Sequence, residues 1–218
     1  MKPIVPSPTA TTLAAKEIRD AISTGKLAPG SRLRQEELAA RLGVSREPIR
    51  KALLLLEREG SIHVVKNGAI VAPLDRRFIT EIFELRETIE SYVVARITKD
   101  QVFDVSSLRS LIVRGHKAAE EGLISRLTDL DEAFHRELYR ASGNRIVVDI
   151  MQTHWSHIRR IMSRATSQRS RKQIWNEHQA ILDAIGKKET SLARNLITRH
   201  VRAALKAALD TLREKASD

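Results

Sequence analysis

The stretch LGVSREPIRKALLLLEREG, residues 42–60, predicts the central helix of an N-terminal domain. Ser45 precedes the helical pattern, and its hydroxyl can accept from the free backbone N–H groups of a first turn. Pro48 falls inside that turn, where no intrahelical hydrogen bond is lost. Apolar residues then recur at helical spacing, and Gly60 can adopt the left-handed conformation that ends a helix. We therefore expect one sharply bounded helix with a buried face.

The other face of this helix is cationic. Arg46 and Arg50 are four residues apart and share that face, with Lys51 beside them. A short helix is predicted over residues 36–42, and the tight Gly-Val link after it gives the spacing of a helix-turn-helix. In such a unit the N-terminal side chains of the second helix reach base edges in the major groove. Arg46 and Arg50 are thus predicted to face DNA.

Beyond Gly60 the apolar pattern changes from helical spacing to alternation. Apolar residues flank Lys66, Asn67 and Gly68, and Asn-Gly is a strong signal for a tight hairpin because both residues tolerate positive φ. A two-stranded wing is therefore expected after the helix-turn-helix. Its tip is placed to contact the DNA backbone or the minor groove.

Composition agrees with a helical, polyanion-binding protein. The 218 residues include 38 Lys and Arg against 27 Asp and Glu, a formal net charge of +11, and only 4% are aromatic. A strongly basic chain favours nucleic acid as a partner. Cysteine is absent, which excludes disulfides and thiolate metal sites, and no apolar run reaches the ~18 residues of a membrane span. We expect a cytoplasmic protein without a membrane partner.

After residue 77 every segment has a helical pattern. Gly122, Gly143 and Gly186 fall at breaks between apolar stripes, and no strand pattern occurs. A helical bundle of about six helices is therefore predicted. The expected helices cover residues 78–98, 105–121, 124–142, 144–166, 170–186 and 189–215.

Four ionisable residues interrupt the apolar stripes of this bundle: Asp131, His135, His178 and His200. Burying unpaired polar groups there would cost several kcal/mol. A shared divalent metal would satisfy all four, because imidazole and carboxylate are ligands of zinc, nickel, iron and manganese. On spacing alone the alternative is stronger, since a single histidine on an apolar face is more often a hydrogen-bonded core residue.

Residues 12–73 resemble the N-terminal domain of the GntR family of bacterial regulators. The resemblance is carried by I22-x-x-G25-x-L27-x-P29-G30, by L42-G43-V44-S45-R46-x-P48-I49-R50-x-A52-L53, by L56-E57-x-E59-G60 and by the N67-G68 wing. It implies that the helix arginines read bases and that the wing tip assists them. The DNA-binding candidates are Arg34, Ser45, Arg46, Arg50, Lys51, Lys66, Asn67 and Gly68.

The helical half is similar to the FCD effector domain of one large GntR subfamily. The similarity is carried by D131-x-x-F134-H135-x-x-L138, A141-S142-G143-N144, E177-H178-x-x-I181-L182-x-A184-I185 and H200. It implies a metal bound through Asp131, His135, His178 and His200, with zinc first and nickel, manganese or iron as alternatives. It also implies a small organic or sugar-acid carboxylate as effector beside that metal.

Two further residues are candidates for effector binding. Arg86 matches a position where the family carries an arginine near this pocket, and its alternative role is a surface ion pair with Glu90 at i+4. Asn144 is the second candidate, with the alternative that it only caps the following helix.

Together these patterns predict a mainly α protein: a winged helix-turn-helix with a two-stranded wing, and an all-α bundle. The expected boundaries are a flexible tail over residues 1–11, the DNA-binding domain over 12–73, a linker over 74–77 and the effector-binding and dimerisation domain over 78–215. The function expected is a homodimeric, ligand-responsive transcriptional regulator on a two-fold DNA operator. Alternatives are a regulator that senses the metal itself and a metal-dependent enzyme, although no H-E-x-x-H, phosphate-loop or nucleophile motif occurs.

Overall fold

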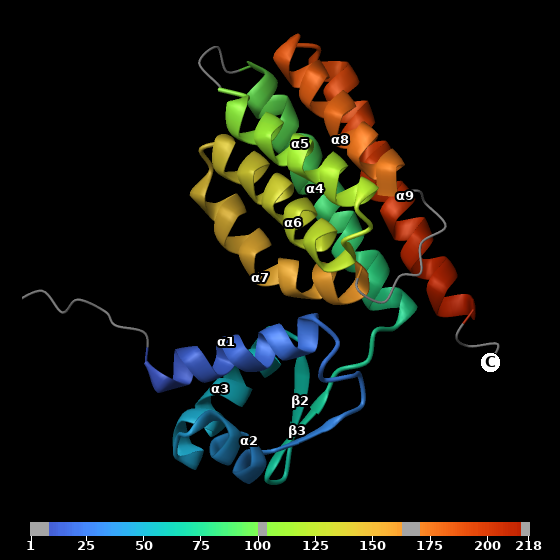
Figure 1. Cartoon of the computed structure of the whole chain (residues 1–218). Helices are drawn as coiled ribbons and strands as arrows, with labels where there is room; N and C mark the ends of the chain where they lie inside the picture. The colour runs from blue at the N-terminus through green and yellow to red at the C-terminus, as the bar shows by residue number, and fades with distance from the viewer. Residues whose placement is uncertain (1–8, 100–103, 163–170, 215–218) are drawn as a thin grey trace, which may run out of the picture. The chain divides into compact units, whose positions relative to one another are not determined.

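The computed structural model describes residues 9–99, 104–162 and 171–214, and the chain divides into two compact units (Figure 1). Unit 1 is Met1–Leu74 and unit 2 is Asp75–Asp218. The elements of unit 1 are α1 (Ala10–Ser23), β1 (Arg32–Arg34), α2 (Gln35–Leu42), α3 (Arg46–Arg58), β2 (Ile62–Val65) and β3 (Gly68–Val71). This order is that of a winged helix-turn-helix, as the sequence predicts.

Helix α3 is the centre of unit 1 because its apolar stripe is completely buried. The stripe consists of Ile49, Ala52, Leu53 and Leu56, each at most 1% exposed, and it packs against α1 and α2. The predicted ends are correct in position, since Ser45 precedes the helix and Gly60 has a φ of 74°.

The predicted capping hydrogen bond of Ser45 is wrong. The Ser45 backbone is extended at the helix start, but its hydroxyl makes no cap hydrogen bond. Glu47 lies in the first turn, where a carboxylate interacts favourably with the helix dipole. Pro48, also in that turn, forfeits no intrahelical hydrogen bond.

The sheet of unit 1 has a third strand that the sequence patterns do not predict. Its order is β1-β3-β2, with both pairs antiparallel, so β3 is central. The hairpin turn lies at Lys66 and Asn67, and Asn67 supplies the positive φ of 62°. Gly68 is required for a different reason: a Cβ there would lie 2.0 Å from the carbonyl oxygen of Leu33 in β1.

Unit 2 is a helical bundle, as predicted (Figure 1). Its helices are α4 (Arg76–Lys99), α5 (Ser106–Glu120), α6 (Ile124–Ala141), α7 (Arg145–Met162), α8 (Arg171–Gly186) and α9 (Thr190–Glu214). Helix α4 packs along α9, and α5 packs against α6 and α8. No helix in the described part of the chain is both long and apolar enough to cross a bilayer.

Two helices begin earlier than the sequence patterns predict. Helix α1 starts at Ala10, inside the segment expected to be a tail, and α4 starts at Arg76, inside the expected linker. Asp75 explains the second start, because its carboxylate accepts a 2.7 Å hydrogen bond from the backbone N–H of Phe78. The rest of the expected tail, residues 1–8, and the predicted C-terminal turn of α7 at 163–166 lie outside the described residues.

Candidate metal centre

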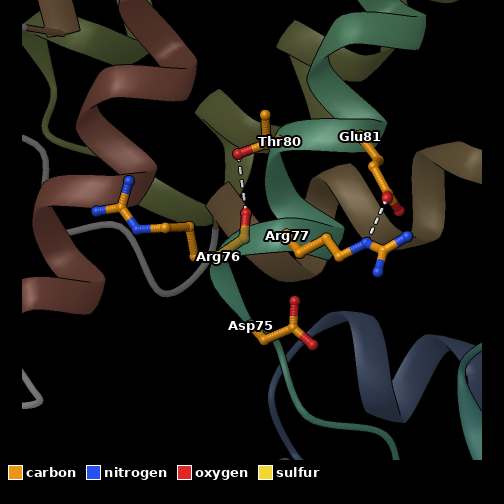
Figure 2. A pocket seen from close by; sticks show the side chains of 5 residues that line it. All are labelled: Asp75, Arg76, Arg77, Thr80 and Glu81. Atoms are coloured by element: carbon orange, nitrogen blue, oxygen red, sulfur yellow. Dashed lines mark hydrogen bonds and ion pairs between the residues drawn. The ribbon is translucent and has the colours of Figure 1, made fainter.

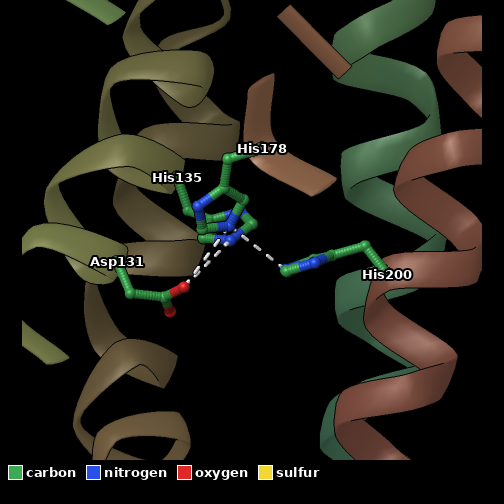
Figure 3. A group of neighbouring side chains, drawn as sticks. All are labelled: Asp131, His135, His178 and His200. Atoms are coloured by element: carbon green, nitrogen blue, oxygen red, sulfur yellow. Dashed lines mark hydrogen bonds and ion pairs between the residues drawn. The ribbon is translucent and has the colours of Figure 1, made fainter. Parts of the chain in front are cut away.

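Three helices of unit 2 bring the four predicted metal ligands together. Asp131 and His135 lie one turn apart on α6, His178 lies on α8 and His200 on α9, and all four point toward one another (Figure 3). Each offers one ligand atom, and these atoms lie within 4.8 Å of one another. No member of the group is more than 4% exposed.

The distances within this cluster are those of ligands around a single ion. Nε2 of His178 lies 3.4 Å from Oδ1 of Asp131 and 3.3 Å from Nε2 of His200. Nε2 of His135 lies 3.9 Å from the same Asp131 oxygen. Ligands about 2.0 to 2.1 Å from a tetrahedral zinc ion are about 3.3 Å apart, so the two shorter distances need little adjustment.

Two carboxylates lie beside the Nδ1 atoms of two of the histidines. Nδ1 of His200 lies 2.9 Å from Oε2 of Glu177, and Nδ1 of His135 lies 3.0 Å from Oε1 of Glu90. The Glu177 carboxylate accepts, so Nδ1 of His200 carries the proton and its Nε2 presents a lone pair, whereas Nδ1 of His135 makes no hydrogen bond to Glu90. That tautomer is the one in which carboxylate-supported histidines bind metals. Burial also lowers the pKa of His200, although Glu177 opposes the shift, and this favours the neutral ring.

Asp131 gives an independent test of whether these residues fit a metal. Both of its oxygens are buried, and neither accepts a hydrogen bond from a described residue. A buried carboxylate without a hydrogen bond, with two histidine nitrogens at 3.4 and 3.9 Å, is unfavourable, and a coordinated cation removes that cost. The donor set of one carboxylate and three imidazoles therefore fits a first-row divalent ion.

Arg86 lies beside this cluster and is entirely buried. Its Nε donates a 2.8 Å hydrogen bond to Glu90, so the i+4 ion pair exists, but it is 0% exposed and the surface alternative is wrong. Tyr139 donates a 2.6 Å hydrogen bond to the same Glu90 oxygen. Burial opposes ionisation of Glu90, yet the positive charge of Arg86, with contacts from His135 and Tyr139, holds its pKa below the ordinary value.

Asn144 has the capping role that was its alternative. Its side-chain oxygen accepts from the backbone N–H of Ile146 at 3.1 Å and of Val147 at 3.4 Å, at the start of α7. Its amide nitrogen lies 3.3 Å from the hydroxyl of Tyr92, which is 44% exposed. Both ends of the side chain are therefore engaged at the surface.

Four of the DNA-binding candidates form an exposed, ion-paired surface on unit 1: Arg34, Arg46, Arg50 and Lys51. Arg46 donates to Glu36 at 2.9 Å, and Arg50 makes two 2.8 Å hydrogen bonds to Glu47. Other pairs join Lys51 to Glu47 at 3.6 Å and Arg34 to Glu37 at 3.1 Å. Exposed pairs of this kind are worth little, so the arginines can exchange a carboxylate for DNA. Lys66 and Asn67 lie exposed at the hairpin tip, as predicted, whereas Gly68, also a predicted DNA-binding residue, begins β3 and is buried beside β1.

Sequence reasoning missed three side chains around the cluster. These are Tyr139, Trp155 and Glu90, the last of which lies beside His135. The Trp155 ring lies 5.1 Å from the Arg86 guanidinium and 5.5 Å from the His135 ring. A signal for two of them was available, because Glu90 is four residues from Arg86 and Tyr139 four from His135. Trp155 gave none, since a tryptophan in an amphipathic helix is ordinarily a core residue.

A depression at the start of α4 is a poorer candidate for a ligand site. It is lined by Asp75, Arg76, Arg77, Thr80 and Glu81 (Figure 2). Arg77 donates to Glu81 at 2.8 Å, and the Thr80 hydroxyl donates to the Arg76 carbonyl at 2.9 Å. These are ordinary contacts along one helix, and the depression contains no predicted site residue.

Comparison with known proteins gives matches over both units. The model for bacterial regulatory proteins of the gntR family matches residues 11–71, and the FCD domain model matches residues 81–203. A Streptomyces ambofaciens protein, an uncharacterized HTH-type transcriptional regulator in an unstable DNA locus, is 32% identical over 86% of this chain and 80% of its own length. The gluconate operon transcriptional repressor of Bacillus licheniformis is 29% identical over 78% of this chain and 70% of its own length.

A solved structure extends the likeness to the whole fold. Escherichia coli McbR/YncC superposes with a TM-score of 0.80 at 21% identity, covering 93% of this chain and 98% of that one. At such an identity the likeness concerns the fold.

Proposed function

We propose, given that this chain belongs to the GntR family of bacterial transcriptional regulators and carries an FCD domain, that it is a dimeric regulator whose DNA binding responds to a small carboxylate at a metal site. DNA-binding regulation follows from the family, and the relatives are regulators, so the enzyme alternative is dropped. The observation that supports the metal and effector is the convergence of Asp131 and three histidines beside the Arg86 guanidinium.

The recognition surface supports the assignment of DNA contacts. Arg46 and Arg50 lie in the first two turns of α3 with exposed guanidinium groups, which suits hydrogen bonds to guanine edges. Lys51 on α3, Arg34 before α2 and Lys66 at the wing tip add positive charge for phosphates. A single winged helix reads few base pairs, so we propose that two copies bind a two-fold operator.

The charged groups of the cluster support an anionic effector. Asp131, Glu90 and Glu177 carry three formal negative charges against one positive charge on Arg86, which leaves two net negative charges with neutral histidines. A divalent ion held by Asp131, His135, His178 and His200 would bring the group to neutrality. A carboxylate would then bind the two positive centres, the ion as a Lewis acid and Arg86 as a hydrogen-bond donor.

A relative supports the same chemical class. The Bacillus licheniformis relative is a repressor of a gluconate operon, and gluconate is a sugar-acid carboxylate. We propose zinc first as the ion, with nickel, manganese and iron as alternatives, because each accepts imidazole and carboxylate. An effector that binds one arrangement of the bundle better would shift the population of DNA-binding dimers.

The test is a thermal-shift screen of a carboxylic-acid panel against zinc-loaded and chelator-treated protein. An acid that binds only the native state raises the melting temperature as its concentration exceeds its dissociation constant. We expect shifts from sugar or organic acids in zinc-loaded protein only, together with a change in operator affinity.

Two other results would change the proposal. If chelation lowers the melting temperature and abolishes operator binding but no acid shifts it, the metal itself is the signal. If chelation has no effect, the cluster is a hydrogen-bonded core and the metal site is wrong.

A further inference from the structure

The Arg86 guanidinium contacts the nitrogen of His135 that faces the cluster. Nη2 of Arg86 lies 2.7 Å from Nε2 of His135, and both residues are 0% exposed. Arginine has only donors and stays charged, so Nε2 of His135 accepts with its lone pair. The proton of the neutral ring is then on Nδ1, which lies 3.0 Å from Oε1 of Glu90.

That lone pair has two possible uses. Nε2 is the His135 atom that lies 3.9 Å from Oδ1 of Asp131, on the side where the four ligands converge. One lone pair cannot be donated to a guanidinium proton and to a metal ion together. Arg86 must therefore withdraw Nη2 before His135 can act as a ligand.

We propose that Arg86 and the divalent cation compete for this lone pair, so that metal binding releases Nη2 of Arg86 as a donor for an anionic effector. The inference rests on the proposed function, because it requires that the cluster binds a metal. Arg86 would thus couple the binding of the metal to the binding of the effector. Its guanidinium lowers metal affinity while it contacts His135, and it can bind an anion once the metal has bound.

The surroundings of Arg86 allow this exchange without loss of its ion pair. Its Nε is held by Glu90 at 2.8 Å, whereas Nη1 is buried with no hydrogen-bond partner among the described residues. The guanidinium carbon lies 5.1 Å from the Trp155 ring and 5.8 Å from the Phe83 ring. Aromatic faces stabilise a cation with little directional demand. Because the guanidinium is a rigid plane, Nη2 is withdrawn by rotation about the Cδ–Nε bond, which leaves the Nε atom in place beside Glu90 and changes the angle of its hydrogen bond.

Electrostatic repulsion alone would also reduce metal affinity, and the experiment must separate the two effects. Arg86→Lys keeps the positive charge beside Glu90, but its Nζ falls near the position of the Arg86 Cζ atom, one bond short of Nη2, so its hydrogen bond to His135 would be longer and weaker. Lone-pair competition therefore predicts tighter zinc binding by the lysine variant. Repulsion alone predicts no change, because the charge is conserved.

The measurement is zinc affinity by competition with a chromophoric chelator, on the full chain. We expect Arg86→Lys to bind zinc up to about tenfold more tightly than the parent, since a hydrogen bond from a charged donor is weakened. Arg202→Lys is the matched control, because Arg202 makes two hydrogen bonds to Glu87, of 2.8 and 2.7 Å, on the exposed side of α9. Its zinc affinity should equal that of the parent.

His178→Ala separates failure of this inference from failure of the metal site. If His178→Ala loses zinc but Arg86→Lys has the parent's affinity, the site stands and the competition is wrong. If the parent and His178→Ala bind zinc equally, the metal site itself is wrong and the competition with it.

A second measurement does not depend on a variant that folds normally. In the nitrogen-15 spectrum of the parent protein, the Arg86 Nε–H signal should shift on zinc addition, while the Arg202 signal stays in place. An Arg86 signal that is unchanged by saturating zinc would overturn the proposal.

Discussion

Tyr139 donates a 2.6 Å hydrogen bond to Oε1 of Glu90 across the α6–α4 packing, with both side chains buried. Arg86 donates to the same oxygen at 2.8 Å, and Nδ1 of His135 lies 3.0 Å from it. One carboxylate oxygen thus accepts hydrogen bonds from a tyrosine and an arginine and lies close to a candidate metal ligand. The cluster is supported by a carboxylate network as well as by apolar packing.

Replacing Tyr139 by phenylalanine should weaken this network. The substitution removes one donor to a buried carboxylate, so we expect a loss of about 1.5 to 3 kcal/mol in the free energy of unfolding. Urea unfolding measures it. Tyr92→Phe is the control, because Tyr92 is 44% exposed, and it should change stability by less than about 0.5 kcal/mol. Equal effects of the two variants would contradict a structural role for the Tyr139 hydroxyl.

Arg46→Ala and Arg50→Ala should each weaken operator binding while the bundle stays intact. A guanidinium that reads a base contributes about 1 to 3 kcal/mol of discrimination, so each variant should lose affinity for a selected operator more than for random DNA. Fluorescence anisotropy measures both affinities. Arg77→Ala is the control, since Arg77 lies on α4 in unit 2 and pairs with Glu81. Unchanged operator affinity in both α3 variants would disprove their assignment.

Glu47 should titrate well below an ordinary glutamate. Hydrogen bonds from Arg50, with a smaller contribution from Lys51, lower its pKa to about 2. Because the folded-state pKa is lowered, the ion pair is complete above the unfolded pKa of about 4.3 and is lost as the pH falls toward 2.

The carbon-13 shift of the Glu47 carboxyl group, followed by NMR against pH, gives the folded-state value. In Arg50→Ala we expect the pKa to rise toward the unfolded value, while Arg46→Ala, whose arginine pairs with Glu36, should leave it in place. A parent pKa near 4.3 would show that the Arg50–Glu47 pair does not persist in solution.

Local patterns predicted the helices because helix formation depends on neighbours in sequence. Apolar spacing and breaks at glycine placed all six helices of unit 2 within a few residues of their described bounds. Strand β1 was missed because its three residues have no pattern of their own and pair with β3 more than thirty residues later. The Asn-Gly pair correctly predicted a hairpin, but glycine is required at position 68 because β1 lies too close for a Cβ atom.

The candidate site shows the same limit. Spacing placed Asp131, His135, His178 and His200 on apolar faces, yet only the three-dimensional packing brings helices α6, α8 and α9 together at those positions. Arg86 and Glu90 are visible as an i+4 pair in the sequence. Their burial and their contact with His135, which is 49 residues from Arg86 in the sequence, depend on tertiary packing and cannot be predicted from local sequence patterns.

Gly115 provides a test of how tightly the scaffold of this site is packed. Helix α5 approaches α8 so closely there that a Cβ on Gly115 would lie 2.2 Å from the Trp175 ring. Trp175 in turn packs edge-on against His178, with ring centroids 4.8 Å apart. Overpacking typically costs about 1 to 3 kcal/mol, so Gly115→Ala should be destabilised by that amount despite the better helix propensity of alanine.

Gly186→Ala is the matched control at the end of α8, where a Cβ would meet no atom within 4 Å. It should be neutral or slightly stabilising, because alanine lowers the entropy of the unfolded chain. Thermal unfolding of both variants measures the difference in stability. Their zinc affinities show whether the altered packing also disturbs the metal site. If Trp175 moves to accept the methyl group, His178 must move with it, so Gly115→Ala should also bind zinc more weakly. If Gly115→Ala is as stable as Gly186→Ala, α5 and α8 can move apart at little cost. The inference that their tight packing holds His178 in place would then be wrong.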